Sequence, residues 1–315
     1  NSVAYKYVKE KQFDTKNQTN NGFTQYEFSI WQDEIPFGNP TVQIPTTWKR
    51  GKVLNKKIYR TIGAARYILE EEKNIYFEDA SNTSFYKGFK MFRMATTNSQ
   101  ENPSNPLIPN CPYNANGGVE VLRTIEPITY NLPILWFYQK TSEKTNYFYN
   151  SSNDLTGKIV SSTTFNYGNP SHLQLTSQIT TNSIGETLET KYFYALDSKM
   201  VSKPFIPELK SAYMIGIVLD KQNFKGGTKI SEQLTNYDKS VETNNLLLPR
   251  FVYINKGQAE IDLNSDRKIT YDLYDEKGNI LQYTPENGIP VSIIWGYNKT
   301  QPIAKIENAA YSTIS

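Results

Sequence analysis

A short polar turn that recurs along the chain constrains its fold more than any other sequence feature. Three copies begin with aspartate or asparagine and end with glycine, namely Asp154–Gly157, Asn182–Gly185 and Asp275–Gly278. The first side chain can accept hydrogen bonds from backbone N–H groups two or three residues further on, and the glycine can adopt the positive φ that closes the turn. Alternating Tyr, Thr and aliphatic residues flank each copy. These features predict antiparallel hairpins that stack side by side, because a single hairpin is unstable in water.

The residue composition favours the same class of fold. Aromatic residues make up 13% of the 315 residues, with 23 Tyr and 15 Phe, and Thr is also frequent. Tyrosine and threonine suit a pleated surface that is half exposed to water. We therefore predict an all-β chain, an antiparallel hairpin meander wound into an open sheet or a partial shell.

The first third of the chain predicts strands interrupted by irregular loops. Residues 1–30 indicate two strands joined by a loop, and residues 31–48 an irregular excursion with Trp31 and Trp48 at its ends. Residues 51–77 favour a hairpin that turns between Thr61 and Ala64, with a short helix over 63–73 as the alternative. Residues 96–118 are expected to be a loop, so we predict a boundary near residue 110. It would separate an N-terminal β region (1–110) from a β-sheet region built of the repeated units (111–315).

The second region predicts a succession of short strands. They are expected at 119–124, 134–140, 145–150, 158–167, 173–181, 187–195 and 211–219, and again at 250–254, 258–263, 268–274, 279–283 and 290–296. The polar stretch 220–250 between the two groups is expected to be a connection without strands.

Charge and cysteine content exclude several classes of function. The 34 basic and 31 acidic residues are intermixed. The densest basic stretch, 48–52, is followed by Glu70 to Glu72, which indicates a solvated strand pair and not a nucleic-acid site.

A single cysteine, Cys111, cannot form a disulfide within the chain. No apolar run reaches the ~20 residues of a membrane span.

The chain carries no signal peptide and does not begin with methionine. We therefore expect it to be an internal portion of a longer polypeptide, whose targeting information lies elsewhere.

Few residues suggest chemistry. His172 follows Ser171, but sequence neighbours rarely form a nucleophile–base pair, so a histidine within a turn or strand is favoured. Asp262, Asn264 and Asp266 have the spacing of calcium ligands but lack the later Gly and Glu, which favours a capped turn. We predict no catalytic residue, no cofactor and no metal site.

Aromatic residues offer a different kind of site. Trp136, Trp295 and Tyr297 lie in aromatic-rich strands and could form a binding surface for sugars or for a partner chain. The alternative for the tryptophans, which we favour, is that they fill the core between sheets.

Two stretches carry a resemblance to a family. The sequence Tyr271-Asp-Leu-Tyr-Asp-Glu-Lys-Gly278 resembles a YD repeat, and residues 286–308 are similar to a stretch common in large Rhs/YD-repeat proteins of Bacteroidota. Residues 165–175, continuing to 185–194, resemble an upstream segment of the same proteins, and residues 48–55 resemble another more weakly.

The resemblance implies a β-sheet wound into a shell that contains or displays a passenger or toxin segment. The partners it implies are the rest of the same chain, an enclosed C-terminal toxin, and secretion-machinery or envelope proteins. It also implies an extracellular or cell-surface location, with type 9 secretion as a plausible route. The Asp-Pro-x-Gly signature of the family's self-cleavage centre is missing, so no catalytic residue is carried over. The alternative function is a surface binding module, or a secretion-system substrate, that contacts glycan or envelope protein through exposed aromatics.

Overall fold

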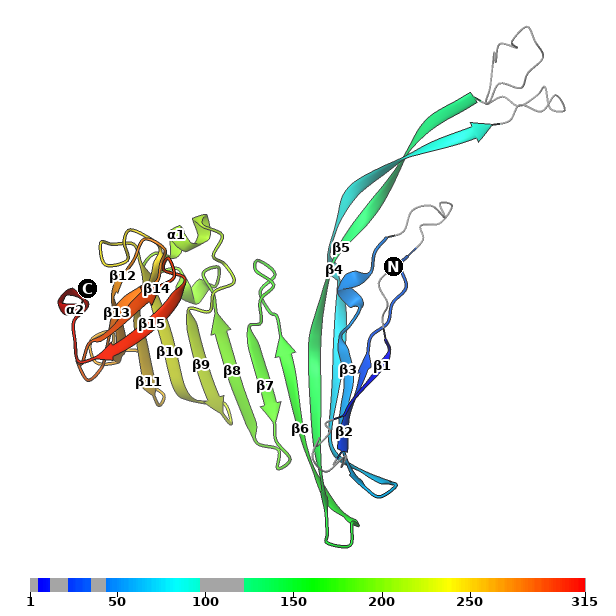
Figure 1. Ribbon diagram of the computed structural model, residues 1–315, viewed down its shortest axis with the longest axis horizontal. Helices are drawn as coiled ribbons and strands as arrows, with labels where there is room; N and C mark the ends of the chain where they lie inside the picture. Colours follow the sequence, from blue (N-terminus) through cyan, green and yellow to red (C-terminus); the bar gives the residue numbers. More distant parts are fainter. Residues whose placement is uncertain (1–4, 12–21, 35–43, 97–121, 315) are drawn as a thin grey trace, which may run out of the picture. The chain divides into compact units, whose positions relative to one another are not determined.

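The computed structural model describes residues 5–11, 22–34, 44–96 and 122–314 and consists almost entirely of β-strands. Fifteen strands form a sheet in which each strand is bonded to its neighbours in the chain, in the order β1 to β15. All pairings from β5 to β15 are antiparallel. Figure 1 shows β6 to β11 side by side in chain order. The predicted all-β class and the antiparallel meander are confirmed.

The strands vary widely in length. They are β1 (Tyr7–Lys11), β2 (Gly22–Phe28), β3 (Val53–Ile62), β4 (Ala65–Thr96), β5 (Leu122–Tyr149), β6 (Leu155–Asn166), β7 (Ser177–Thr181), β8 (Thr187–Phe193), β9 (Asp220–Lys225), β10 (Thr228–Asp238), β11 (Leu248–Lys256), β12 (Arg267–Tyr274), β13 (Ile280–Pro285), β14 (Val291–Gly296) and β15 (Gln301–Glu307). Four helical turns complete the fold: η1 (Thr47–Lys49), η2 (Ser198–Met200), α1 (Ile206–Ser211) and α2 (Tyr311–Ile314).

Contacts divide the chain into two units, each assembled from separate segments. The first unit comprises residues 1–8, 27–53 and 77–138, and the second comprises 9–26, 54–76 and 139–315. The boundary predicted near residue 110 and the loop predicted at 96–118 fall almost wholly outside the described residues.

The first unit contains the excursion predicted at 31–48. Of its described residues, Glu34 and Ile44 form an isolated bridge, and η1 follows. The buried Ser29 hydroxyl donates to the carbonyl of Lys49 at 2.5 Å and accepts from the backbone N–H of Lys52 at 3.0 Å. The Lys49 ammonium group contacts Glu78 at 2.6 Å. These bonds hold the end of the excursion to the neighbouring strands.

The hairpin predicted between residues 51 and 77 is confirmed. Strands β3 and β4 pair from Asn55 with Lys73 to Ile62 with Ala65, and the turn contains Gly63 at φ +60°. The alternative helix over 63–73 is wrong, since those residues lie in the turn and in β4.

Several strand predictions in the second half are wrong in an instructive way. Of residues 211–219, Ser211 ends α1 and the others form turns and irregular chain, and the polar stretch 220–250 contains both β9 and β10, joined at Gly226 and Gly227 with positive φ. Residues 258–263 form a loop, and the strand at β15 was missed. Residues 134–140 and 145–150 belong to one continuous strand, because Thr141 to Lys144 keep their register with β6. The apolar residues of 211–219 predicted a strand, but Met214, Ile217 and Leu219 belong to the core packed on one face of the sheet.

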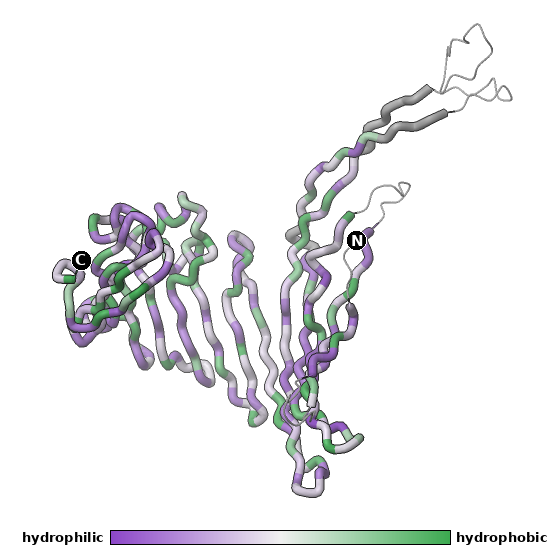
Figure 2. The backbone as a smooth tube through the Cα atoms, in the orientation of Figure 1, coloured by the Kyte–Doolittle hydropathy of each residue, from purple (hydrophilic) through white to green (hydrophobic). Residues whose placement is uncertain are grey.

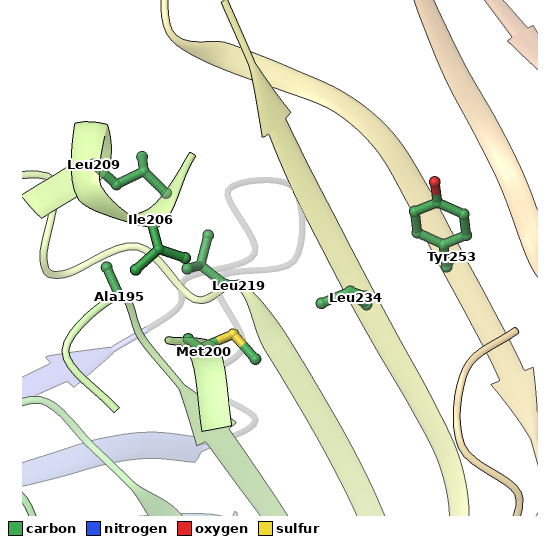
Figure 3. Close-up of a cluster of buried hydrophobic side chains, with 7 residues drawn as sticks. All are labelled: Ala195, Met200, Ile206, Leu209, Leu219, Leu234 and Tyr253. Atoms are coloured by element: carbon green, nitrogen blue, oxygen red, sulfur yellow. The ribbon is translucent and has the colours of Figure 1, made fainter. Parts of the chain in front are cut away.

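A compact core lies where one segment crosses the sheet. Residues 194–219, here called the cover segment, include η2 and α1. Their apolar side chains meet β10 and β11 in one buried cluster of Ala195, Met200, Ile206, Leu209, Leu219, Leu234 and Tyr253. Figure 3 shows this cluster. Leu234 and Tyr253 pair across the two strands and so point to the same side, here called the core face.

Candidate functional site

The most unusual group of side chains in the second unit is a buried ionic cluster beneath the cover segment. Lys199, in η2, places its Nζ atom 2.5 Å from Oδ2 of Asp220 and 2.9 Å from Oε1 of Glu232. Asp220 is the first residue of β9, and Glu232 lies in β10. The lysine therefore joins the cover segment to two strands of the core face.

Two further side chains complete the cluster. Gln222 lies opposite Glu232 in the register of β9 and β10 and donates to its Oε1 atom at 3.0 Å. Lys229 contacts Oε2 of Glu232 at 2.7 Å and the exposed Glu260 at 3.2 Å. A bulge between Lys229 and Ser231 turns Lys229 toward the core face, which an unbroken alternation would not do.

Different hydrogen-bond partners give the two buried carboxylates opposite pKa shifts. Asp220 is 1% exposed and Glu232 3%. Burial raises the pKa of Asp220 to about 6, although Lys199 opposes this. Burial would also raise the pKa of Glu232, but hydrogen bonds from Lys229, Lys199 and Gln222 outweigh it and lower that pKa to about 2. Among the described residues, Lys199 is the one cation that forms an ion pair with the Asp220 carboxylate, so this buried group depends on that contact.

Sequence reasoning missed this cluster entirely, because it treated 220–250 as a polar connection. In the structure, Asp220 and Gln222 are buried on either side of the exposed Lys221, and Glu232, Leu234 and Asn236 are buried at period two in β10. Because Asp220, Lys221 and Gln222 are all polar, the sequence of β9 lacks the apolar and polar alternation that indicates a strand.

The single histidine, His172, is fully used by local hydrogen bonds. Its Nδ1 accepts from the backbone N–H of Gln174 at 2.9 Å, which places the proton on Nε2, 3.2 Å from Oδ1 of Asp197. Asp197 also accepts from Asn169 and from the backbone N–H of Tyr194, both at 2.7 Å. Because both ring nitrogens have partners, the imidazole links Gln174 and Asp197 within this loop. The neighbouring Ser171 donates its backbone N–H to Asn169.

Two of the predicted turns have the same hydrogen bonds. Oδ1 of Asn182 accepts from the N–H groups two and four residues on, at 3.1 and 2.9 Å, and Oδ1 of Asp275 accepts from its equivalents at 2.9 Å each. Gly185 and Gly278 both have φ +80°. Hydrogen bonds from Asn279 and Lys277 outweigh burial and lower the pKa of Asp275.

The first predicted turn, Asp154 to Gly157, is displaced. The turn begins at Asn150, whose Oδ1 accepts from the N–H of Asp154 at 2.8 Å. Asn153, at φ +67°, takes the place that glycine has in the other copies. Gly157 lies within β6, opposite Phe148. This copy of the turn therefore starts four residues earlier than predicted, which is possible because asparagine is one of the few residues other than glycine that adopt the left-handed conformation.

The stretch with calcium-like spacing is also a turn. Asp262 accepts from the backbone N–H of Asn264 at 2.9 Å, and Asp266 accepts from that of Asp262 at 2.9 Å. Among the described residues, no group of three or more His, Cys, Asp or Glu side chains is arranged to hold a metal ion.

The three aromatic candidates differ in environment. Trp136, in the first unit, packs against Tyr138 with ring centroids 4.3 Å apart. Trp295, in the second unit, is half-buried and donates to the carbonyl of Ile280 at 2.9 Å. Tyr297 is 77% exposed. Trp295 is thus tied to its own sheet, and Tyr297 alone presents most of its ring to solvent.

Comparisons with known proteins assign no family. No family model and no curated protein matches the chain. Among solved structures it is similar to the crystal structure of TcdB2-TccC3 without the hypervariable C-terminal region, with 8% identity and a TM-score of 0.36. That alignment covers 96% of this chain and 21% of the other, so this chain spans about a fifth of its length. In the described part of the chain, no helix combines the length and the apolar character needed to cross a membrane.

Proposed function

We propose that this chain is a wall section of a β shell of the Rhs/YD-repeat type, which contains or displays a passenger segment. The proposal is supported by the resemblance of residues 271–278 and 286–308 to that family. The observation that carries it is the sheet itself, whose strands follow one another in chain order without a crossover. A sheet built in this way extends by simple addition of hairpins, which is the construction that a continuous wall requires.

The face opposite to the core face could meet a passenger. The registers place Phe148, Ile159 and Leu188 on this opposite face, and they are between 45% and 46% exposed. Hydrophilic residues run through the same strands, with short hydrophobic stretches between them (Figure 2). Scattered apolar groups in a polar surface suit weak, non-specific contact with an unfolded chain, because no large apolar patch is needed.

In this proposal the section does not turn over an external substrate. Its carboxylate pair is sealed under the cover segment, and its histidine is engaged on both nitrogens. An exported or surface location is part of the same proposal and depends on the resemblance alone.

Binding of an unfolded probe tests containment. Reduced, carboxymethylated α-lactalbumin, labelled with a fluorophore, is titrated with the 315-residue chain and followed by anisotropy. We expect the unfolded probe to bind and native α-lactalbumin not to bind. The triple variant Phe148→Ser, Ile159→Ser, Leu188→Ser should bind about tenfold more weakly, a loss of about 1.4 kcal/mol.

Ile184→Ser provides the matched control, because Ile184 is 83% exposed but lies at the tip of a turn. It should leave binding unchanged. If the triple variant binds as well as the wild type, the opposite face does not contact passengers. If the native probe binds as tightly as the unfolded one, the alternative of a general surface binding module gains support.

A further inference from the structure

Three parts of the chain bring one amine and two carboxylates together under the cover segment. Nζ of Lys199 is 2.5 Å from Asp220 and 2.9 Å from Glu232. The centroid of the Phe193 ring lies 4.8 Å from the same nitrogen, and Phe193 packs against the buried cluster that includes Met200, Leu219 and Leu234. A lysine held against an aspartate, with a second carboxylate on the same nitrogen and apolar neighbours, is an arrangement for amide formation as well as for an ion pair.

We propose that Lys199 and Asp220 condense into an intramolecular amide bond, with Glu232 as the catalytic proton carrier, so that the cover segment becomes covalently attached to β9. This modification goes beyond the proposed function, because it depends only on the contacts of Lys199 with Asp220 and Glu232 and not on what the sheet contains or displays.

The reaction balances without an added reactant. Glu232 accepts a proton from the Lys199 ammonium group, and the neutral amine attacks Cγ of the protonated Asp220 carboxyl group. A C–N bond forms, and the C–O bond to the aspartate hydroxyl breaks. Glu232 gives this proton to the departing hydroxyl, which leaves as water, and then takes up the surplus proton of the new amide nitrogen, so that the site ends neutral with Glu232 protonated. No oxidant, reductant or activating group is consumed.

The surroundings favour two requirements of this step, the close approach of the two groups and the acid form of Asp220. The fold holds the amine within contact distance of the carboxyl group, which replaces an encounter in solution by a fixed geometry. Burial raises the pKa of Asp220 to about 6, which populates the carboxylic acid form that condenses. Burial would lower the pKa of Lys199, but its hydrogen bonds with Asp220 and Glu232 outweigh this and raise it, so the amine has to pass a proton to the ionised Glu232 before it can attack. The product is neutral, so the reaction removes two charges from a buried site.

The bond would supply a crosslink that the chain cannot obtain otherwise. Its single cysteine excludes an internal disulfide. An amide between residues 199 and 220 would close a loop that contains α1 and would hold the cover segment on the core face even when the sheet is strained. A wall section exposed to proteases would benefit from such a lock.

Mass spectrometry of the purified 315-residue chain tests the proposal. We expect the intact mass to fall below the sequence mass by one water, and protease digestion to yield a branched peptide joining Lys199 to Asp220. Lys199→Met and Glu232→Gln should each restore the full sequence mass. Asp220→Asn should instead lose one ammonia, because the amide is then the leaving group.

Lys225→Met is the matched control, since Lys225 lies in β9 like Asp220 but forms its ion pair with Glu186, outside the cluster. It should keep the loss of one water. Circular dichroism establishes that each variant is folded. A folded wild-type chain that retains its full mass after prolonged incubation at pH 6 would overturn the proposal. A loss of water that persists in Glu232→Gln would overturn the role of Glu232.

Discussion

Strands β5 to β7 and strands β9 to β11 belong to the same sheet but are stabilised in different ways. No residue of β6 is buried, and its contacts are backbone ladders and pairs such as the hydroxyls of Thr163 and Thr180, 2.9 Å apart. In β10, by contrast, Glu232, Leu234 and Asn236 are all buried by the cover segment and its neighbours. The two regions have similarly polar sequences, so the difference arises from what lies on the sheet and not from the strands themselves.

The comparison shows how a polar strand can become part of a core. A carboxylate such as Glu232 tolerates burial because Lys229, Lys199 and Gln222 satisfy it. The polar side chains of β6 need no such partners in the protein, because water reaches them. A repeated hairpin therefore provides the wall, and one non-repeated segment provides a local core.

The largest expected effect is the loss of unfolding free energy when a core side chain is truncated, and it should differ between β10 and β6. Leu234→Ala removes a side chain that is 2% exposed and should cost about 3 kcal/mol of unfolding free energy. Ile159→Ala, at 46% exposure on β6, should cost less than about 1 kcal/mol. Urea unfolding of both variants measures the difference. Equal costs would mean that the cover segment does not create a distinct core.

A pH titration addresses the ionic cluster in the same region. In Lys199→Met no crosslink can form, and Asp220 loses its cation, so its folded pKa rises above the value of about 6. A raised folded pKa means that the stability contribution is full below the unfolded pKa of about 4 and is lost as the pH rises through the folded value. The unfolding free energy should therefore fall by up to about 1.4 kcal/mol per pH unit between these two values.

The double variant Lys199→Met, Asp220→Asn is the reference for that titration, because the remaining carboxylates are common to both. Subtracting its profile isolates Asp220. A flat difference between pH 4 and pH 7 would show that water reaches this carboxylate and that the cover segment is not closed.

The smallest effect concerns the turns. Gly278→Ala places a side chain at φ +80° and should cost about 1 kcal/mol. Gly157→Ala should be neutral or slightly stabilising, because Gly157 has an ordinary strand conformation and open space where a Cβ would stand. Thermal unfolding compares them. Equal losses would restore Gly157 as a turn residue and contradict the displaced first turn.

The sequence by itself determined the class of the fold and most of its hairpins. Alternation and turn residues are local signals, and the backbone bonds at Asn182 and Asp275 are local consequences of them. Even the displaced turn at Asn150 follows the same chemistry. These features need only a few neighbouring residues, so they could be predicted without knowing what packs against them.

Only the tertiary structure decided where the core and the candidate site lie. The apolar residues of 211–219 have the pattern of a strand, but several of them pack on the sheet and belong to its core. The polar residues of β9 and β10 have the composition of a connection, but several of them are buried. The contact between Lys199 and Asp220 depends on the path of the intervening segment, which contains α1. Periodicity predicts which residues share a face, whereas the burial of that face depends on long-range packing that no local pattern encodes.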